Sequence, residues 1–142
     1  MAAVMGIDYG DSRIGIAVSD SMRIVATPRC VIDGKKSLAE TVAAIGAVYE
    51  AEKCDTVVVG YPINMDGSFG NRIHRTEKFI EKFSERYPDA QVVRQDERLT
   101  TRSADRAMIT MGVSQRRKGI SDMIAAQIIL QSYLDANARS DQ

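Results

Sequence analysis

Four acidic residues of this 142-residue chain stand where a carboxylate needs an explanation. The first is Asp8, which directly follows the apolar run 4–7 and lies between Gly6 and Gly10. A charged carboxylate on a buried strand costs on the order of several kcal/mol unless it is paired or binds a cation. An ion pair with Arg13 is one explanation, and coordination of a metal ion is the other.

Asp96 and Glu97 form the second acidic position, at the end of a predicted strand over 90–95. Neighbouring side chains on a strand point to opposite faces, so only one of the two can face Asp8. We predict that Glu97 is this residue, and we leave open whether Asp96 also contributes. The simpler alternative is that both acids belong to the turn before the next helix.

Asp122 is the third acidic position, and it precedes the most apolar helix pattern of the chain, 124–134. With Ser121 as the N-cap, Asp122 would lie in the first helical turn, where the helix dipole alone explains a negative charge. A helix that is apolar nearly all round must be buried, however, so its start is held at a fixed place near the strands. The pattern therefore allows Asp122 to join the other acids.

The elements that position these acids begin with three predicted strands, 2–7, 13–19 and 25–31. Turn residues separate them at 10–12 and at 20–21. Three consecutive strands with short turns predict an antiparallel meander.

Alternating helices and strands follow this meander. Ser37 and Glu40 form a capping box for the first helix, and the segment 55–60, with its apolar run 57–59, predicts a strand that is buried on both faces. The remaining elements are a helix with Ile73, Ile80, Phe83 and Tyr87 on one face, the strand at 90–95, a helix from Thr100 or Thr101 to Met111, and the last helix. This order predicts an α/β fold with a mixed five-stranded sheet and helices on both faces.

The composition, 44% hydrophobic and 27% charged, is that of one compact domain, which we assign to 1–138 with a tail at 139–142. No apolar run approaches the ~20 residues of a membrane helix. The start at 1–5 does not resemble a secretion signal, so we expect a cytoplasmic protein without a membrane partner. Cys30 and Cys54 are expected to be buried free thiols.

The 19 basic and 19 acidic residues balance, so any binding of a polyanion must be local. Basic residues gather after the midpoint of the chain. They are Arg72, Arg75, Arg94, Arg98, Arg102, Arg106, Arg116, Arg117 and Lys118. A helix-spaced set of this kind is either a binding surface or an ordinary solvated face.

Four ordered segments resemble the YqgF/RuvX family, whose members are described as pre-16S ribosomal RNA nucleases and as Holliday junction resolvases. They are GIDYGDSRIGIAVSD at 6–20, VVGYPINMDGS at 58–68, DERLTT at 96–101 and KGISDMIAAQIILQSYLD at 118–135. The resemblance covers nearly the whole chain and implies an RNase H-like fold with a metal-dependent phosphodiesterase site. The acids of that site fall on Asp8, Glu97 and Asp122. Ser121 departs from the family, in which we expect an aliphatic residue, but it leaves the neighbouring acid in place.

The resemblance implies hydrolysis of a phosphodiester by water, with two Mg²⁺ or Mn²⁺ ions held about 4 Å apart by the three carboxylates. Hard oxygen ligands suit these ions better than zinc. Asn64 either positions the substrate or caps a turn. The expected phosphate contacts are Arg98, Arg102, Arg116, Arg117 and Lys118.

The nucleic-acid substrate is either a pre-16S ribosomal RNA, with ribosomal precursor particles as partners, or a branched DNA junction. Resolution of a junction needs two symmetric cuts and hence a homodimer, whereas a monomer is enough to trim an RNA end. Two other hypotheses are an ATPase, because an Asp-x-Gly turn also occurs in the actin and sugar-kinase group, and a non-catalytic RNA-binding assembly factor. The single-domain length disfavours the first, and the three acids disfavour the second.

Overall fold

The computed structural model describes residues 2–63, 66–67, 70–96 and 118–140. In these residues the strands are β1 (Ala3–Tyr9), β2 (Arg13–Ser19), β3 (Ala26–Asp33), β4 (Cys54–Tyr61) and β5 (Gln91–Asp96), and the helices are α1 (Leu38–Ala51), α2 (Asn71–Arg86) and α4 (Lys118–Ser140). The predicted strands agree with these bounds to within two residues. The helix predicted from Thr100 or Thr101 to Met111 lies outside the described residues.

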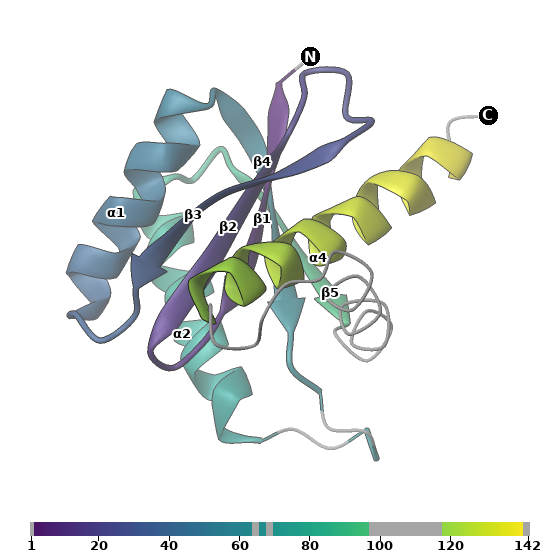
Figure 1. The fold of residues 1–142 in the computed structure, drawn as a ribbon. Helices are drawn as coiled ribbons and strands as arrows, with labels where there is room; N and C mark the ends of the chain where they lie inside the picture. The colour runs from purple at the N-terminus through teal and green to yellow at the C-terminus, as the bar shows by residue number, and fades with distance from the viewer. Residues whose placement is uncertain (1, 64–65, 68–69, 97–117, 141–142) are drawn as a thin grey trace.

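The described strands form one sheet in the order β3-β2-β1-β4-β5 (Figure 1). The central strand β1 is antiparallel to β2 and parallel to β4. At the two edges, β3 pairs antiparallel with β2, and β5 pairs parallel with β4. Parallel neighbours need a crossover connection, and α2 provides it between β4 and β5. The predicted mixed five-stranded sheet is confirmed.

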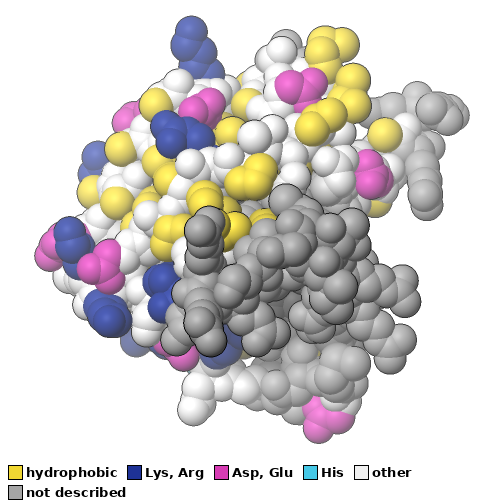
Figure 2. Space-filling view, in the orientation of Figure 1, with side chains coloured by type: hydrophobic (Ala, Val, Ile, Leu, Met, Phe, Trp, Pro, Cys, Tyr) yellow, Lys and Arg dark blue, Asp and Glu magenta, His cyan; other side chains and the backbone are white. Residues whose placement is uncertain are grey.

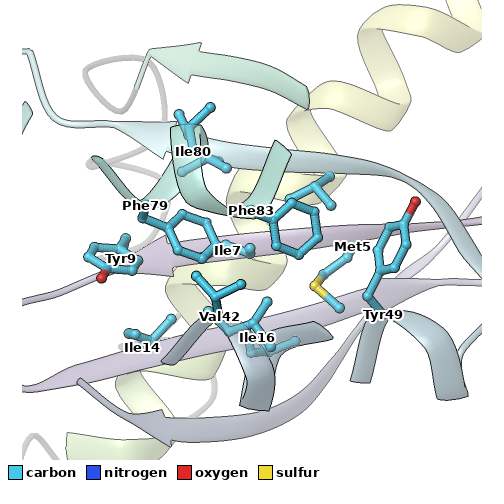
Figure 3. Close-up of a cluster of buried hydrophobic side chains, with 13 residues drawn as sticks. Met5, Ile7, Tyr9, Ile14, Ile16, Val42, Tyr49, Phe79, Ile80 and Phe83 are labelled. Carbon is cyan, nitrogen blue, oxygen red and sulfur yellow. The ribbon is translucent and has the colours of Figure 1, made fainter. Parts of the chain in front are cut away.

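Helices α1 and α2 cover one face of the sheet, and Figure 3 shows the cluster of buried side chains beneath them. This cluster consists of Met5, Ile7, Tyr9, Ile14, Ile16, Val42, Ile45, Tyr49, Val57, Val59, Phe79, Ile80 and Phe83. The rings of Tyr9 and Phe79 stack with their centroids 4.8 Å apart, which fixes the last residue of β1 against α2.

Helix α4 covers the opposite face, where it lies across the sheet in Figure 1. The core on this side consists of Val4, Ala17, Ala26, Val58, Ala126, Ile129, Leu130 and Leu134. Alternate residues of a strand point to opposite faces, so Val4, Gly6 and Asp8 of β1 lie on the α4 side. The strand therefore carries one acid at the end of an otherwise apolar row.

Local sequence signals set several element ends. The Ser37 hydroxyl accepts a hydrogen bond from the Glu40 amide and donates one to the Glu40 carboxylate, both at 3.2 Å, so the predicted cap of α1 is present. Helix α2 ends at Arg86, and Pro88 follows two residues later.

Cys30 and Cys54 are free thiols, partly buried beside the core, and burial raises the pKa of Cys54 to about 12.

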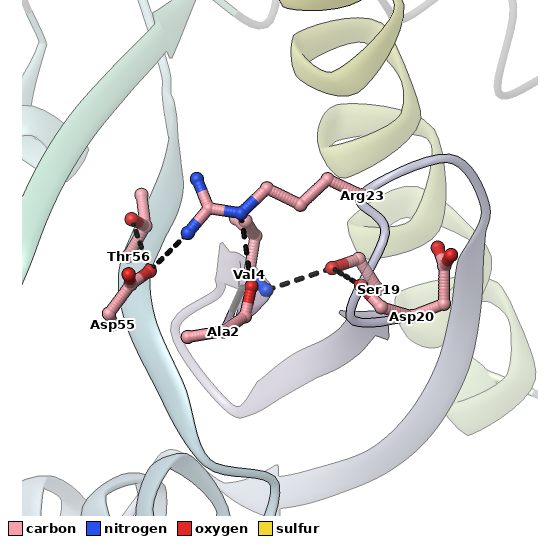
Figure 4. A network of polar contacts seen from close by, with 7 residues as sticks. All are labelled: Ala2, Val4, Ser19, Asp20, Arg23, Asp55 and Thr56. Carbon is pink, nitrogen blue, oxygen red and sulfur yellow. Dashed lines mark hydrogen bonds and ion pairs between the residues drawn. The ribbon is translucent and has the colours of Figure 1, made fainter.

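Ion pairs and hydrogen bonds close the end of the sheet where β1 begins (Figure 4). Arg23, with a left-handed φ of 60°, donates to the Asp55 carboxylate at 2.6 Å and to the Ala2 carbonyl at 3.0 Å. The Ser19 hydroxyl accepts from the Val4 amide at 2.8 Å. These contacts fasten the β2–β3 turn to β1.

Among the described residues, none of the helices combines the length and the apolar character that a bilayer span requires.

Gly6→Ala is expected to destabilise the protein, because the added Cβ would lie 2.6 Å from the Leu130 Cβ and 2.9 Å from the Ala126 carbonyl oxygen. Overpacking of this kind costs about 1–3 kcal/mol. Gly119→Ala is the matched control, since its Cβ would find only an ordinary contact, 3.7 Å from Val31. Urea unfolding of both variants checks this difference, and equal stabilities would contradict the close packing of α4 on β1.

Candidate active site

Asp8 lies at the end of the sheet opposite to the Arg23 network. It is the second-last residue of β1, half-buried, and its register partner on β2 is Gly15. Residues directly opposite each other on antiparallel strands present their side chains to the same face. Asp8 and the bare backbone of Gly15 therefore lie side by side beneath α4.

Gly15 allows the beginning of α4 to touch the sheet. A Cβ at Gly15 would lie 2.0 Å from the carbonyl oxygen of Asp122 and 2.4 Å from its carbonyl carbon. Any side chain at Gly15 would thus push α4 away. Because Gly15 is also the partner of Asp8, the structure brings Asp8 and Asp122 to the same end of the same face.

The prediction that Ser121 caps the last helix is wrong, and so is the placement of Asp122 in its first turn. Helix α4 already includes Lys118, and its first turn contains no acidic side chain. Gly119 is within packing distance of Val31, so the helix already contacts the sheet before Ser121. A serine cap contributes about 1 kcal/mol to helix stability. Burial of apolar side chains along the helix contributes more, so packing against the sheet decides where the helix starts. The helix dipole therefore does not explain Asp122.

Arg13 instead accounts for the position of the Asp122 side chain. Its Nε donates to Asp122 Oδ2 at 2.6 Å, with 42% of the Arg13 side chain and 21% of the Asp122 side chain exposed. The alternative that Arg13 pairs with Asp8 is wrong. A charge-assisted hydrogen bond at this exposure contributes no more than about 1 kcal/mol, but it fixes the direction of the carboxylate. Sequence reasoning missed this partnership because it joins residues far apart in the chain.

The acid at the end of β5 lies on the other side of the sheet. Asp96 is the register partner of Tyr61, and it lies two residues after Arg94 and therefore on the same face of β5. The Arg94 guanidinium binds the Glu77 carboxylate of α2 at 2.6 and 3.0 Å. The Tyr61 hydroxyl donates to the same carboxylate at 2.8 Å. Asp96 therefore belongs to the α2 face, whereas Asp8 belongs to the α4 face. Glu97 lies outside the described residues, so its orientation toward Asp8 stays a prediction.

Several predicted site residues lie outside the described residues, and the structure does not place their side chains. They are Asn64, Glu97, Arg98, Arg102, Arg116 and Arg117, together with the side chain of Lys118. In the part of the chain that is described, no group of three or more His, Cys, Asp or Glu side chains is arranged to hold a metal ion. The described part of the candidate site thus consists of two carboxylates, Asp8 and Asp122, and one guanidinium, that of Arg13.

The chain matches the model of the RuvX family, described as Holliday junction resolvase, over residues 2–136. It belongs to the RuvX family. A relative from Ruminiclostridium cellulolyticum is 44% identical over 133 residues, 93% of each chain, and one from Acetivibrio thermocellus is 42% identical over 137 residues, 96% of this chain and 97% of the relative. Both carry the name "Putative pre-16S rRNA nuclease".

Solved structures of a distant protein have the same fold as this RuvX-family chain. Thermus thermophilus RuvC in complex with a Holliday junction substrate has a TM-score of 0.63 and 14% identity, with 99% of this chain and 98% of that chain covered. Thermus thermophilus RuvC alone has a TM-score of 0.57 with 96% of both chains covered. At this identity the likeness establishes the fold alone, and that fold is RNase H-like.

Glu77→Gln tests the network that fixes the end of β5. Arg94 lowers the pKa of Glu77, so the carboxylate stabilises the fold at neutral pH and this contribution is lost as pH falls through the folded-state pKa. Solvent screening limits the effect to less than about 1 kcal/mol, because both side chains are more than a third exposed. Urea unfolding at pH 7 should show the variant to be less stable, and the difference should shrink towards pH 4. A constant difference would contradict an electrostatic origin.

Proposed function

We propose that this protein is a metal-dependent endonuclease that hydrolyses phosphodiester bonds of nucleic acid, and that it processes the 5′ end of pre-16S ribosomal RNA. Hydrolytic nuclease activity follows from membership of the RuvX family and from the names of the relatives. The observation that supports a metal-dependent site is the approach of Asp122 to Asp8 through Gly15, and the names of the relatives support pre-16S ribosomal RNA as the substrate.

Glu97 is proposed as the third acid of the site. Asp96 belongs to the α2 face, and on a strand the next residue points to the opposite face, which is that of Asp8. Three carboxylates at one place repel one another, and a bound cation is the usual means by which proteins offset that repulsion. Strand alternation is thus the reason to propose Glu97 rather than Asp96 as the third acid.

The donor set fits Mg²⁺ or Mn²⁺, because it consists of carboxylate oxygens. Asp8, Glu97 and Asp122 would hold the ions. Bound in pairs, such ions activate water and offset the charge that develops on the phosphate. Arg13 keeps the Asp122 carboxylate directed toward the β1–β2 end of the sheet, and its guanidinium is itself a group that can bind a phosphate oxygen.

The remaining assignments of the proposal concern the substrate and its setting. The proposed phosphate contacts are Arg98, Arg102, Arg116, Arg117 and Lys118, with Asn64 as a substrate-positioning residue. Ribosomal precursor particles in the cytoplasm are the proposed partners. In the sequence, Asn64 follows β4, Arg98 and Arg102 follow β5 and Glu97, and 116–118 precede Asp122 by a few residues.

A four-way DNA junction is the second candidate substrate, because the family description names Holliday junction resolvases and one solved relative in fold is a junction complex. Both substrates present the same phosphodiester, so stoichiometry separates them. Symmetric resolution requires two sites related by a two-fold axis and hence a dimer. An RNA end requires one site.

Asp8→Asn, Glu97→Gln and Asp122→Asn are each expected to lower Mg²⁺-dependent cleavage by at least about 100-fold. Loss of an outer-shell partner of a metal ion already lowers metal affinity or activity by about 10- to 100-fold, and loss of a ligand lowers it further. Asp96→Asn is the matched control, since it removes the neighbouring charge on the opposite face, and its activity should stay near that of the wild type. Gel assays with a pre-16S fragment, with and without EDTA, measure these rates. Cleavage unchanged in Asp8→Asn would disprove the site.

Substrate choice is tested by giving the wild-type protein the pre-16S fragment and a four-way junction in parallel, with the oligomeric state measured by light scattering. We expect cleavage of the RNA by a monomer. A dimer that makes paired, symmetric cuts only in the junction would favour the resolvase instead. Binding of RNA without cleavage of either substrate would support the assembly-factor hypothesis.

A further inference from the structure

Five basic residues belong to the three segments that meet at the β1–β2 turn, at the same end of the sheet as Asp8. We propose that this basic surface, defined as Arg13, Lys35, Lys36, Arg72 and Arg75, binds the phosphate backbone of the nucleic acid next to the carboxylates. The inference deepens the proposed nuclease function and rests on it. None of these five residues is among the phosphate contacts predicted from the sequence.

Two of the arginines reach the turn from α2. Arg72 Nη2 donates to the carbonyl oxygen of Tyr9, the neighbour of Asp8, at 3.4 Å. Arg75 forms an ion pair with the Asp11 carboxylate, and its Nη2 lies 3.4 Å from the Asp11 carbonyl oxygen. Both arginines are exposed, with 45% of the Arg75 side chain accessible, so both lie at the surface that a ligand would meet. The contacts hold the two guanidinium groups beside the end of β1.

The two lysines reach the same turn from the loop after β3. Gly34 donates its amide to the Ser12 carbonyl at 2.9 Å, and a Cβ on Gly34 would lie 3.2–3.3 Å from backbone atoms of 10–12. This packing places the exposed residues Lys35 and Lys36 next to the turn. In Figure 2 dark-blue side chains, with a few magenta ones, gather at the lower left, where Figure 1 places the β1–β2 turn and the β3–α1 loop.

The local charge favours a polyanion although the chain as a whole is neutral. The segments 10–13, 33–36 and 71–75 contain five Lys or Arg and two Asp, Asp11 and Asp33, which leaves a net charge of +3, and the neighbouring carboxylates of Asp8 and Asp122 lower it to +1 before any cation binds. At the other end of the sheet, Arg23 is already bound to Asp55 and to a backbone carbonyl. A carboxylate site repels phosphate unless positive groups adjoin it, and the basic surface supplies them.

The stability of α2 as a helix does not favour its two arginines near the turn. Exposed ion pairs such as Arg75–Asp11 contribute little to stability, and cations near the start of a helix oppose its dipole. The first turn of α2 contains no acidic residue, and Gly70 provides no side-chain cap. Arg86 at the far end of α2 has the placement that helix stability favours. The arginines near the turn are therefore better explained by binding of an external anion.

The test compares two double variants of the full-length chain that remove the same charge from the same helix. Arg72→Gln/Arg75→Gln alters the basic surface, whereas Lys82→Gln/Arg86→Gln, the matched control, alters the other end of α2. Fluorescence anisotropy with labelled single-stranded RNA and with a labelled four-way DNA junction, in EDTA to prevent cleavage, gives the dissociation constant from 50 to 200 mM salt. Circular dichroism verifies that each variant is folded.

We expect the Arg72/Arg75 variant to bind at least about fivefold more weakly at 50 mM salt, and the control to bind as the wild type does. On RNA, the slope of log affinity against log salt should fall in magnitude by about 0.7 for each phosphate group that the variant no longer binds. Weaker binding of either nucleic acid by the Arg72/Arg75 variant supports the inference. The nucleic acid whose binding is weakened identifies the backbone that the basic surface binds. Equal affinities of the two double variants on both would overturn it.

Asp11→Asn separates a binding role of Arg75 from a structural one. If Arg75 only anchors the turn, loss of its partner should weaken binding as much as Arg75→Gln does, and the inference fails. If Arg75 binds phosphate, Asp11→Asn releases its guanidinium, and affinity should be unchanged or higher. Because these measurements do not depend on cleavage, their outcome is distinct from that of the Asp8→Asn assay, which tests the nuclease function itself.

Discussion

The close approach of α4 to the backbones of β1 and β2 is the contact on which the candidate site depends. Gly6 and Gly15 have no side chains to separate the helix from the sheet, and a Cβ at either position would overlap Leu130 or Asp122. Interiors are packed too densely to absorb such an overlap without a shift of the helix. The two glycines therefore set the height of α4 above the sheet, and with it the position of Asp122 relative to Asp8.

Strand alternation places Asp8 on the face of the sheet that α4 covers. The row Val4, Gly6 and Asp8 runs along the underside of α4, apolar at one end and acidic at the other. The same helix thus packs a core with its later turns and carries Asp122 to the acidic end with its early ones. On β5 the alternation has the opposite effect, because it turns Asp96 toward α2 and separates it from Asp8.

The two ends of the sheet differ in how their charges are used. Where β1 begins, Arg23 satisfies Asp55 and a backbone carbonyl and closes the hairpin. Where β1 ends, Arg13 pairs with Asp122, and the arginines of α2 contact the β1–β2 turn while staying exposed to solvent. A neutral chain can in this way present a charged surface at one place, since the distribution of charges decides local binding and the total does not.

The order of the strands and helices and the mixed sheet could be predicted from the amino-acid sequence alone, because they follow from periodicity, turn residues and local motifs. The same is true of the cap of α1, where Ser37 and Glu40 are three residues apart. The start of α4 and the partner of Arg13 could not be predicted, since the cap preference of Ser121 is weak and the Arg13–Asp122 pair joins residues distant in the chain. Both depend on the folded arrangement, in which Gly119 already packs against Val31 ahead of Ser121 and Arg13 meets Asp122 across the fold.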